Sequence, residues 1–207
     1  MISNDLENHF SNIADILNEI GDRVEGNLVC DVSADNLIIN RNLEKIQNLK
    51  YLSNGKQNIC EIGVNAGHSL LIMLDENPNA NYHLFDLGNH RYTKPCLDYI
   101  KSEYPNTNIN ITYGDSKETI RDYIFNNKSK IQSYDLIHID GGHGDLELTS
   151  DFYMSSILIK KDGVLIMDDY DYPNIENFID DRLKVGSIRR YKDENLKITN
   201  RHFIYTY

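Results

Sequence analysis

Three aspartates follow two apolar runs in the second half of the chain. Asp140 comes directly after the run 136–139, and Asp168 and Asp169 come directly after the run 164–167. Carboxylates that are packed together repel one another unless a positive charge lies between them, and hard divalent cations prefer oxygen ligands. The pattern therefore predicts a site for Mg²⁺ or another divalent cation. The structural alternative is that Asp168 and Asp169 form a turn while Asp140 caps a helix.

A histidine close to the first of these carboxylates is suited to move a proton. His143 lies three residues after Asp140, and Gly141 and Gly142 give the loop freedom to turn its ring into a cleft. Its ordinary pKa of about 6.5 suits a general base near neutral pH. We therefore predict that His143 and Asp140 are catalytic; the alternative is that His143 only stabilises Asp140. His138, inside an apolar run, is expected to be a hydrogen-bonded core residue.

A glycine-containing turn follows the apolar run 59–62. Gly63 and Gly67 would let the backbone turn sharply and approach a ligand closely. Ser69 would begin a helix whose free N–H groups can face a carboxylate. Asn65 stands where the dinucleotide-binding fingerprint has its middle glycine, and no phosphate-binding lysine follows. The turn therefore predicts a ligand other than a pyrophosphate.

Two further acids follow apolar runs in the middle of the chain. Asp86 lies 23 residues after Gly63, close to the spacing at which an acid hydrogen-bonds ribose hydroxyl groups. Asp115, followed by Ser116, could accept a hydrogen bond from the exocyclic amine of a base. Asp115 could equally be the N-cap of a helix over 116–125, and the two roles are compatible.

Apolar runs alternate with amphipathic segments of ten or more residues from residue 59 onward. This alternation predicts an α/β fold, a doubly wound, mostly parallel sheet with helices on both faces, over residues 51–207. The last two runs have no helix between them and predict an antiparallel pair. The runs are 59–62, 82–85, 109–113, 136–139, 164–167, 188–191 and 202–205. Ligands bind such a sheet at the carboxyl ends of its strands, where the residues described above lie.

The first fifty residues have a helical pattern instead. Apolar residues recur at helical spacing over 6–20, and Gly21 or Gly26 would end this helix. A second helix is expected over 42–52. We therefore predict an N-terminal helical cap over 1–50, which either gates a substrate site or only packs against the main domain.

Composition limits the classes of partner. With 207 residues and a net charge of −11, the chain suits one domain and lacks the clustered Lys and Arg that bind nucleic acid or anionic membranes. No apolar run approaches the ~20 residues of a membrane helix, and the N-terminus does not read as a secretory signal, so a cytoplasmic location is expected. Cys30, Cys60 and Cys96 are too far apart along the chain to predict a zinc site or a disulfide framework.

Five motifs, in their order and spacing, resemble the class I S-adenosylmethionine-dependent methyltransferases. They are Glu-Ile-Gly-Val-Asn-Ala-Gly-His-Ser at 61–69, Phe-Asp-Leu-Gly at 85–88, Gly-Asp-Ser at 114–116, Ile-Asp-Gly-Gly-His at 139–143 and Met-Asp-Asp-Tyr at 167–170. Within that class the chain is most similar to the small-molecule O-methyltransferases related to the macrocin and catechol enzymes, from about residue 58 to the C-terminus. The resemblance implies a Rossmann-like, seven-stranded sheet whose last strand is antiparallel.

The resemblance also implies roles for the site residues. S-adenosylmethionine would lie with its methionine part at the glycine turn, its ribose at Asp86 and its adenine at Asp115. In the metal-dependent relatives, magnesium is held at the positions of Asp140, Asp168 and Asp169, the last being Asn in some of them. The catechol enzymes have a lysine at the position of His143. The predicted cofactor-binding residues are Glu61, Gly63, Asn65, Gly67, Ser69, Asp86, Asp115, Ser116 and Asp140.

The activity implied is transfer of a methyl group to a hydroxyl of a small molecule such as a sugar, a polyol or a catechol. Tyr170 and Tyr172 would line a substrate pocket or simply pack. A nucleic-acid base methyltransferase is disfavoured because the 140–143 segment lacks the Pro-Pro-aromatic sequence of those enzymes. The rival function is a non-catalytic protein that holds the cofactor or serves as a subunit of an assembly. A homodimer through the N-terminal helices is a further expectation.

Overall fold

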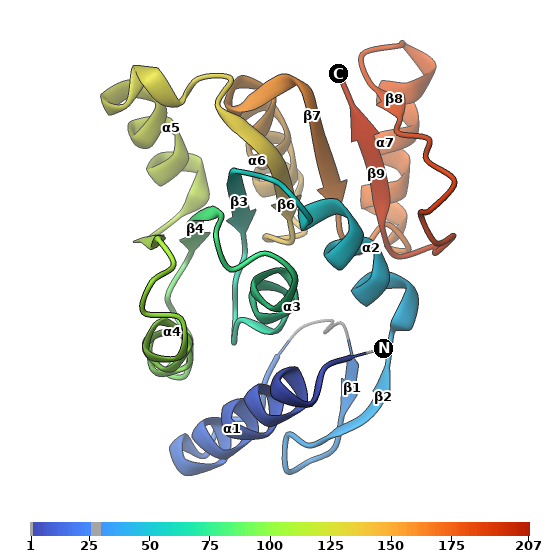
Figure 1. The fold of residues 1–207 in the computed structure, drawn as a ribbon. Helices are drawn as coiled ribbons and strands as arrows, with labels where there is room; N and C mark the ends of the chain where they lie inside the picture. Colours follow the sequence, from blue (N-terminus) through green and yellow to red (C-terminus); the bar gives the residue numbers. More distant parts are fainter. Residues whose placement is uncertain (1, 26–29) are drawn as a thin grey trace.

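The computed structural model describes residues 2–25 and 30–207 (Figure 1). Gly26, one of the two glycines expected to end the first helix, lies outside the described residues. The strands of the main sheet are β3 (Asn58–Ile62), β4 (Asn81–Asp86), β5 (Ile109–Tyr113), β6 (Tyr134–Ile139), β7 (Ile159–Met167), β8 (Arg189–Arg190) and β9 (Phe203–Thr206). Their order is β5-β4-β3-β6-β7-β9-β8. β9 runs antiparallel to β7 and β8, and the other neighbouring pairs are parallel, which confirms the predicted sheet.

Side chains on the central strands alternate between two apolar cores. In β3, Ile59 joins one core and Cys60 the other, and Leu136 and Ile137 repeat this division in β6. A period of two is that of a strand, and coverage of both faces explains why these runs are apolar almost throughout. Glu61 interrupts the pattern, because it lies on the same face as Ile59 and has no exposed surface.

Helices cover both faces of the sheet. The helices that contribute to the core on the Cys60 side are α5 (Ser116–Asn126), α6 (Asp145–Leu158) and α7 (Pro173–Lys184). The helices that contribute to the core on the Ile59 side are α1 (Asn4–Ile20), α2 (Leu43–Ser53), α3 (His68–Glu76) and α4 (Thr93–Glu103). A short 3₁₀ helix, η1 (Lys128–Lys130), precedes β6. No described helix is both long enough and apolar enough to span a membrane.

The N-terminal region follows its helical prediction in part. Ser3 accepts a hydrogen bond from the Leu6 N–H as the N-cap of α1, and Gly21, with φ of 79°, ends the helix. Between α1 and α2, β1 (Cys30–Val32) and β2 (Ile38–Arg41) form an antiparallel hairpin that the sequence did not predict. Strands of 3 and 4 residues are too short to show a period of two along the chain.

The N-terminal helices share a core with the main sheet. Leu6 and Leu17 of α1 and Leu49 of α2 belong to the same cluster as Leu70 of α3. α1 lies against α3 and α4 at one end of the molecule (Figure 1). Residue 50, the predicted limit of the cap, falls inside α2. The N-terminal elements therefore help to form the sheet's own core.

Candidate active site

A cleft of about 790 Å³ opens at the carboxyl edge of the parallel strands, where residues at the ends of β3 to β7 line it. This is the expected place for a ligand in an open parallel sheet. The predicted site residues in its lining are Gly63, Asn65, Ser69, Asp86, Asp115, Ser116, Asp140, His143 and Asp169. Glu61, Gly67 and Asp168 lie outside the lining. Tyr172 is part of it, whereas Tyr170 packs on Phe203 with ring centroids 5.0 Å apart.

The turn after β3 requires glycine at its first position. Gly63 has φ of +83°, and a Cβ there would lie 1.9 Å from the carbonyl oxygen of Asp140. That contact is with backbone, so a side chain could be accommodated only if β3 and β6 moved apart. Gly67, at φ of +86°, is the N-cap of α3. The turn thus brings bare backbone to the wall of the cleft, as a ligand that approaches the main chain needs.

Asp86 holds this turn in place. Its Oδ2 accepts hydrogen bonds of 2.9 Å from the N–H groups of Val64 and Asn65, and its Oδ1 accepts one of 2.8 Å from Gly88. Carboxylate oxygens have room for further donors, so these hydrogen bonds leave Asp86 able to accept from ribose hydroxyls. That contact stays a prediction. Asn65, with φ of +54°, donates through Nδ2 to the Glu25 carbonyl at 2.6 Å.

Asp115 is the N-cap of α5, as its structural alternative predicted. It accepts a 3.0 Å hydrogen bond from the backbone N–H of Lys117, and the Lys117 ammonium lies 3.0 Å from its other oxygen. These contacts hold the pKa of Asp115 below its usual range. The ammonium also pairs with Glu147. The predicted contact of Asp115 with an adenine amine is compatible with this geometry and stays a prediction.

His143 pairs with Asp169 at the mouth of the cleft. Its Nε2 lies 3.0 Å from Asp169 Oδ2, and its side chain is 37% exposed, whereas that of Asp169 is only 3% exposed. The hydrogen bond that His143 donates to Asp169 raises the pKa of His143, against the opposing effect of burial. The Tyr172 ring stacks obliquely on the imidazole, with centroids 4.7 Å apart. A histidine ordered by a carboxylate and open to a cleft has the arrangement of a general base.

Asp140 lies deeper in the same cleft. Its backbone N–H donates to the Ile62 carbonyl at 2.8 Å, which continues the β3–β6 ladder to the edge of the sheet. Its side chain is half-buried. Burial and the neighbouring Asp168 charge raise the pKa of Asp140 well above its usual range, although His138 and Lys45 oppose this shift.

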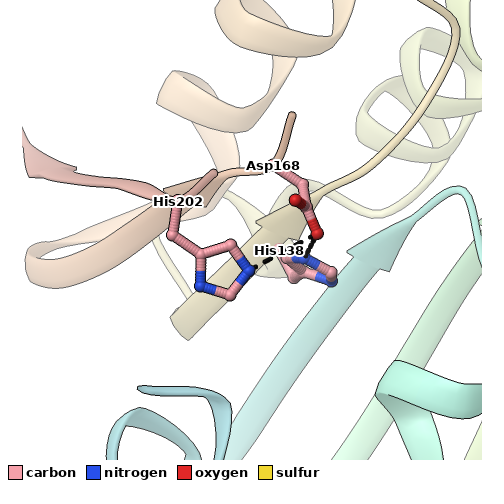
Figure 2. A group of neighbouring side chains, drawn as sticks. All are labelled: His138, Asp168 and His202. Carbon is pink, nitrogen blue, oxygen red and sulfur yellow. Dashed lines mark hydrogen bonds and ion pairs between the residues drawn. The ribbon is translucent and has the colours of Figure 1, made fainter. Parts of the chain in front are cut away.

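Asp168 belongs to a buried ion-pair network behind the cleft. Lys45 Nζ lies 2.6 Å from its Oδ1, and His138 Nε2 lies 3.2 Å from its Oδ2. His202 Nε2 lies 3.4 Å from Oδ2 on the other side (Figure 2). Burial alone would raise the pKa of Asp168, but His202, Lys45 and His138 hold it well below its usual range.

The network continues to the glycine turn. His138 Nδ1 lies 2.9 Å from Glu61 Oε1, and Ser69 donates to the same oxygen. Burial alone would lower the pKa of His138, but its hydrogen bonds to Asp168 and Glu61 raise it to about 10. His138 is thus the hydrogen-bonded core residue that the sequence predicted. Glu61 has no exposed surface, so it does not face the cleft itself. It orients the Ser69 hydroxyl by accepting its hydrogen bond.

The structure does not bring the three predicted metal ligands together. Among the described residues, the side chains that place ligand atoms within 4.8 Å of one another are those of His138, Asp168 and His202. Asp169 is engaged with His143, and Asp168 with Lys45. Period-two alternation directs Asp168 to the sheet face covered by α2, away from the cleft.

Lys45 and His202 were missed by the sequence interpretation. Lys45 lies four residues before Leu49 and seven before Leu52, so it shares the buried face of α2 with them. A lysine in register with leucines is a signal for a buried acidic partner, although it does not say which one. His202 is the first residue of the predicted run 202–205 and gave no signal of its own. Lys117 and Arg201, which line the cleft, were also not predicted.

Comparison with known proteins now identifies the family. The family described as a methyltransferase domain matches residues 60–170, more than half of the chain. The chain belongs to this methyltransferase family. The match spans the glycine turn, both acidic strand ends in the middle of the chain, and the segment that carries His143 and Asp169. No curated protein matches the methyltransferase.

Solved structures of low sequence identity share the methyltransferase's fold. A candidate caffeoyl-CoA O-methyltransferase from Staphylococcus aureus is 18% identical, with a TM-score of 0.63 over 98% of this chain and 95% of that chain. An O-methyltransferase from Bacillus cereus, in complex with SAH, is 16% identical, with a TM-score of 0.65 over 99% and 91%. A spermidine synthase is 15% identical, with a TM-score of 0.54 over 83% and 63%. The Rossmann-like methyltransferase fold predicted from the sequence is confirmed.

Proposed function

We propose that this methyltransferase transfers a methyl group from S-adenosylmethionine to a hydroxyl group of a small molecule. The observation that carries the proposal is the His143–Asp169 pair in a cleft that the glycine turn also lines. The fold alone would not decide the reaction, since a spermidine synthase shares it.

The cleft suits the cofactor in volume and in charge. Its volume of about 790 Å³ is in the range of a site for a nucleoside-sized ligand. Carboxylates outnumber the ammonium and guanidinium groups in its lining, and such a rim favours the cationic sulfonium of S-adenosylmethionine. The lining acids are Glu25, Asp86, Asp115, Asp140, Glu147 and Asp169. The similar Bacillus cereus structure holds SAH, which supports the same class of ligand here.

The residues of the cleft would prepare the acceptor. When bound, S-adenosylmethionine supplies an electrophilic methyl carbon, which passes to the acceptor oxygen while the bonding electron pair stays on sulfur. His143 would take the hydroxyl proton as the oxygen attacks. Because its Nε2 faces Asp169, the tautomer with a proton on Nε2 leaves the Nδ1 lone pair free to accept that proton. Asp169 would stabilise the imidazolium that forms.

The predicted magnesium site is not part of the proposed mechanism. A metal bridging Asp140, Asp168 and Asp169 would need free carboxylate oxygens on all three. Asp168 contacts Lys45 through one oxygen and two histidines through the other. The donor set therefore does not fit Mg²⁺, and deprotonation is assigned to the His143–Asp169 pair.

A transfer assay tests the proposal. The protein would be incubated with S-adenosylmethionine labelled in its methyl group and with a panel of sugars, polyols and catechols. We expect label in an acceptor hydroxyl and equal formation of S-adenosylhomocysteine. The non-catalytic binding protein would be favoured if the cofactor bound but no member of the panel became labelled. In that case the amount of label transferred would not differ between wild type and His143→Ala.

A further inference from the structure

The buried Lys45–Asp168 ion pair engages a carboxylate that the sequence predicts as a ligand of a divalent cation. We infer that the Lys45 ammonium takes the place of that cation, so that the methyltransferase works without a bound divalent metal. The inference rests on the proposed function, because it concerns how the same site is held together. Lys45 does not line the cleft, and its role is that of a positioning residue.

The ammonium is connected to the general base through a short chain of contacts. Asp168 Oδ1 lies 2.6 Å from Lys45 Nζ and also accepts a 2.7 Å hydrogen bond from the backbone N–H of Asp169. Asp169 has φ of +53° and pairs with His143 through its side chain. Lys45 therefore neutralises the carboxylate that fixes the backbone of Asp169, and Asp169 in turn orients His143.

No face of the Asp168 carboxylate is open to a hydrated cation. Its second oxygen lies between His138 and His202, and Figure 2 shows both imidazole rings directed toward it. Asp168 is 2% exposed and does not line the cleft. Mg²⁺ needs near-octahedral oxygen ligands and keeps several waters, and an enclosed carboxylate with two nitrogen neighbours offers neither.

The same residues raise the alternative of a transition-metal centre. His138, Asp168 and His202 each place one ligand atom within 4.8 Å of the others, a donor set that zinc or iron accepts. Lys45 argues against this alternative. Its ammonium already compensates the Asp168 charge at hydrogen-bond distance, and a second cation a few ångströms away would be repelled in this buried place.

A second lysine on the same helix shows that the position of Lys45 is particular. The Lys50 side chain is 21% exposed and pairs with Asp75 of α3 at 2.6 Å, outside the network around Asp168. The Lys45 side chain has no exposed surface. Burial of an unpaired ammonium is strongly unfavourable, so the stability of this arrangement depends on Asp168. Lys50 provides a matched control of the same residue type on the same helix.

The first test measures metal binding without turnover. The wild-type protein, with S-adenosylhomocysteine present, would be titrated with Mn²⁺ by electron paramagnetic resonance and with Zn²⁺ against a chromogenic chelator. We expect no stoichiometric binding of either ion at micromolar concentration, and methyl transfer that EDTA does not reduce. Stoichiometric binding of either ion that disappears in Asp168→Asn would overturn the inference. This readout does not depend on finding an acceptor, so it separates failure of the inference from failure of the proposed function.

The second test measures the positioning role. We expect Lys45→Met to lower kcat roughly 10–100-fold, the range for loss of a group that supports an active-site residue from behind. The dissociation constant of S-adenosylhomocysteine and the KM of the acceptor should stay near wild type, and Lys50→Met should leave kcat unchanged. Lys45→Gln keeps a hydrogen-bond donor but loses the charge, and its kcat should be lowered as much as that of Lys45→Met. Lys45→Gln serves as the test if Lys45→Met does not fold. An unchanged kcat in a folded, cofactor-binding Lys45 variant would overturn the role.

Discussion

His143 and Asp169 show what residue types can and cannot tell at the scale of single side chains. Both were predicted as site residues from their places after β6 and β7, and both line the cleft. Their pairing was not predicted, because Asp169 was expected to bind a metal together with Asp140 and Asp168. Which way a side chain points after a strand depends on the local backbone, here a positive φ of 53° at Asp169. A glycine in the sequence suggests a positive φ, but an aspartate gives no such indication.

The acid limb of the pH–rate profile should depend on Asp169. Its hydrogen bond raises the pKa of His143, so the base is protonated, and inactive, up to a higher pH than for an isolated imidazole. Removal of the charge in Asp169→Asn should therefore move the acid limb of kcat/KM to lower pH while lowering the plateau. The profile is measured as the initial rate of methyl transfer from pH 5 to 9. An acid limb at the same pH in both proteins would show that His143 is not the titrating base.

Loss of the imidazole should separate chemistry from binding. We expect His143→Gln to lower kcat by about 10²–10⁴-fold, the range for loss of a general base, because glutamine keeps a polar side chain but cannot take up the hydroxyl proton. The affinity for S-adenosylhomocysteine should stay near that of wild type, since His143 lies at the mouth rather than at the glycine turn. Equal loss of binding and turnover would assign His143 to the cofactor instead.

At the scale of elements, the sequence identified those with a clear period and missed those without one. Strands β3, β4 and β6 contribute side chains to both cores, so their sequences are mostly apolar. The bounds of these strands were predicted within one or two residues. β7 begins at Ile159, five residues before its predicted start, because Lys160 and Lys161 interrupt the apolar run. The β1–β2 hairpin is too short to be recognised from its pattern.

The turn between β3 and α3 should tolerate no side chain at its first position. Gly63→Ala adds a Cβ 1.9 Å from a backbone oxygen, in a left-handed conformation. We expect it to lower the free energy of unfolding by roughly 3 kcal/mol or more and to abolish cofactor binding. Chemical denaturation and calorimetry measure the two effects.

Gly55→Ala is the matched control for this prediction. Gly55 also has a positive φ, of 68°, but a Cβ there meets nothing within 4 Å. Gly55→Ala should lower the free energy of unfolding only by the cost of the left-handed conformation, about 1–2 kcal/mol. The variant should bind the cofactor normally. If the two variants behaved alike, the close approach of Gly63 to the β6 strand end would have no special importance.

At the scale of the whole molecule, one face of the sheet carries a connected set of buried charges. Glu61 and His138 are register partners on β3 and β6, and Asp168 continues the same face from β7. Lys45 arrives from a helix 123 residues earlier in the chain. The sequence interpretation predicted the carboxyl ends of β3, β6 and β7 but could not bring Lys45 to Asp168, because that contact depends on how α2 packs and not on any local period.

The stability of the folded protein should fall between pH 7 and 9. His138 has a folded-state pKa raised to about 10 from its ordinary value of about 6.5. The stabilisation that it contributes is therefore complete below about pH 6.5 and is lost as the pH rises toward 10. Denaturant unfolding at each pH measures the slope.

Two histidine variants distinguish this effect from other titrations. His138→Gln should flatten the decline, although it lowers stability overall. His83, whose pKa burial lowers to about 4, stays neutral throughout this range, so His83→Gln should keep the wild-type slope. A decline that survives in His138→Gln would mean that another group causes it.

The central claim is that the cleft at the carboxyl edge of the sheet is a site for S-adenosylmethionine, and calorimetry tests it most directly. Titration of the wild-type protein with S-adenosylmethionine and with S-adenosylhomocysteine should give one site per chain with micromolar affinity, in EDTA as well as in Mg²⁺. His143→Gln should bind both and Gly63→Ala neither. Absence of binding for both nucleosides to folded wild-type protein would contradict the account and leave the acidic cleft without its proposed ligand.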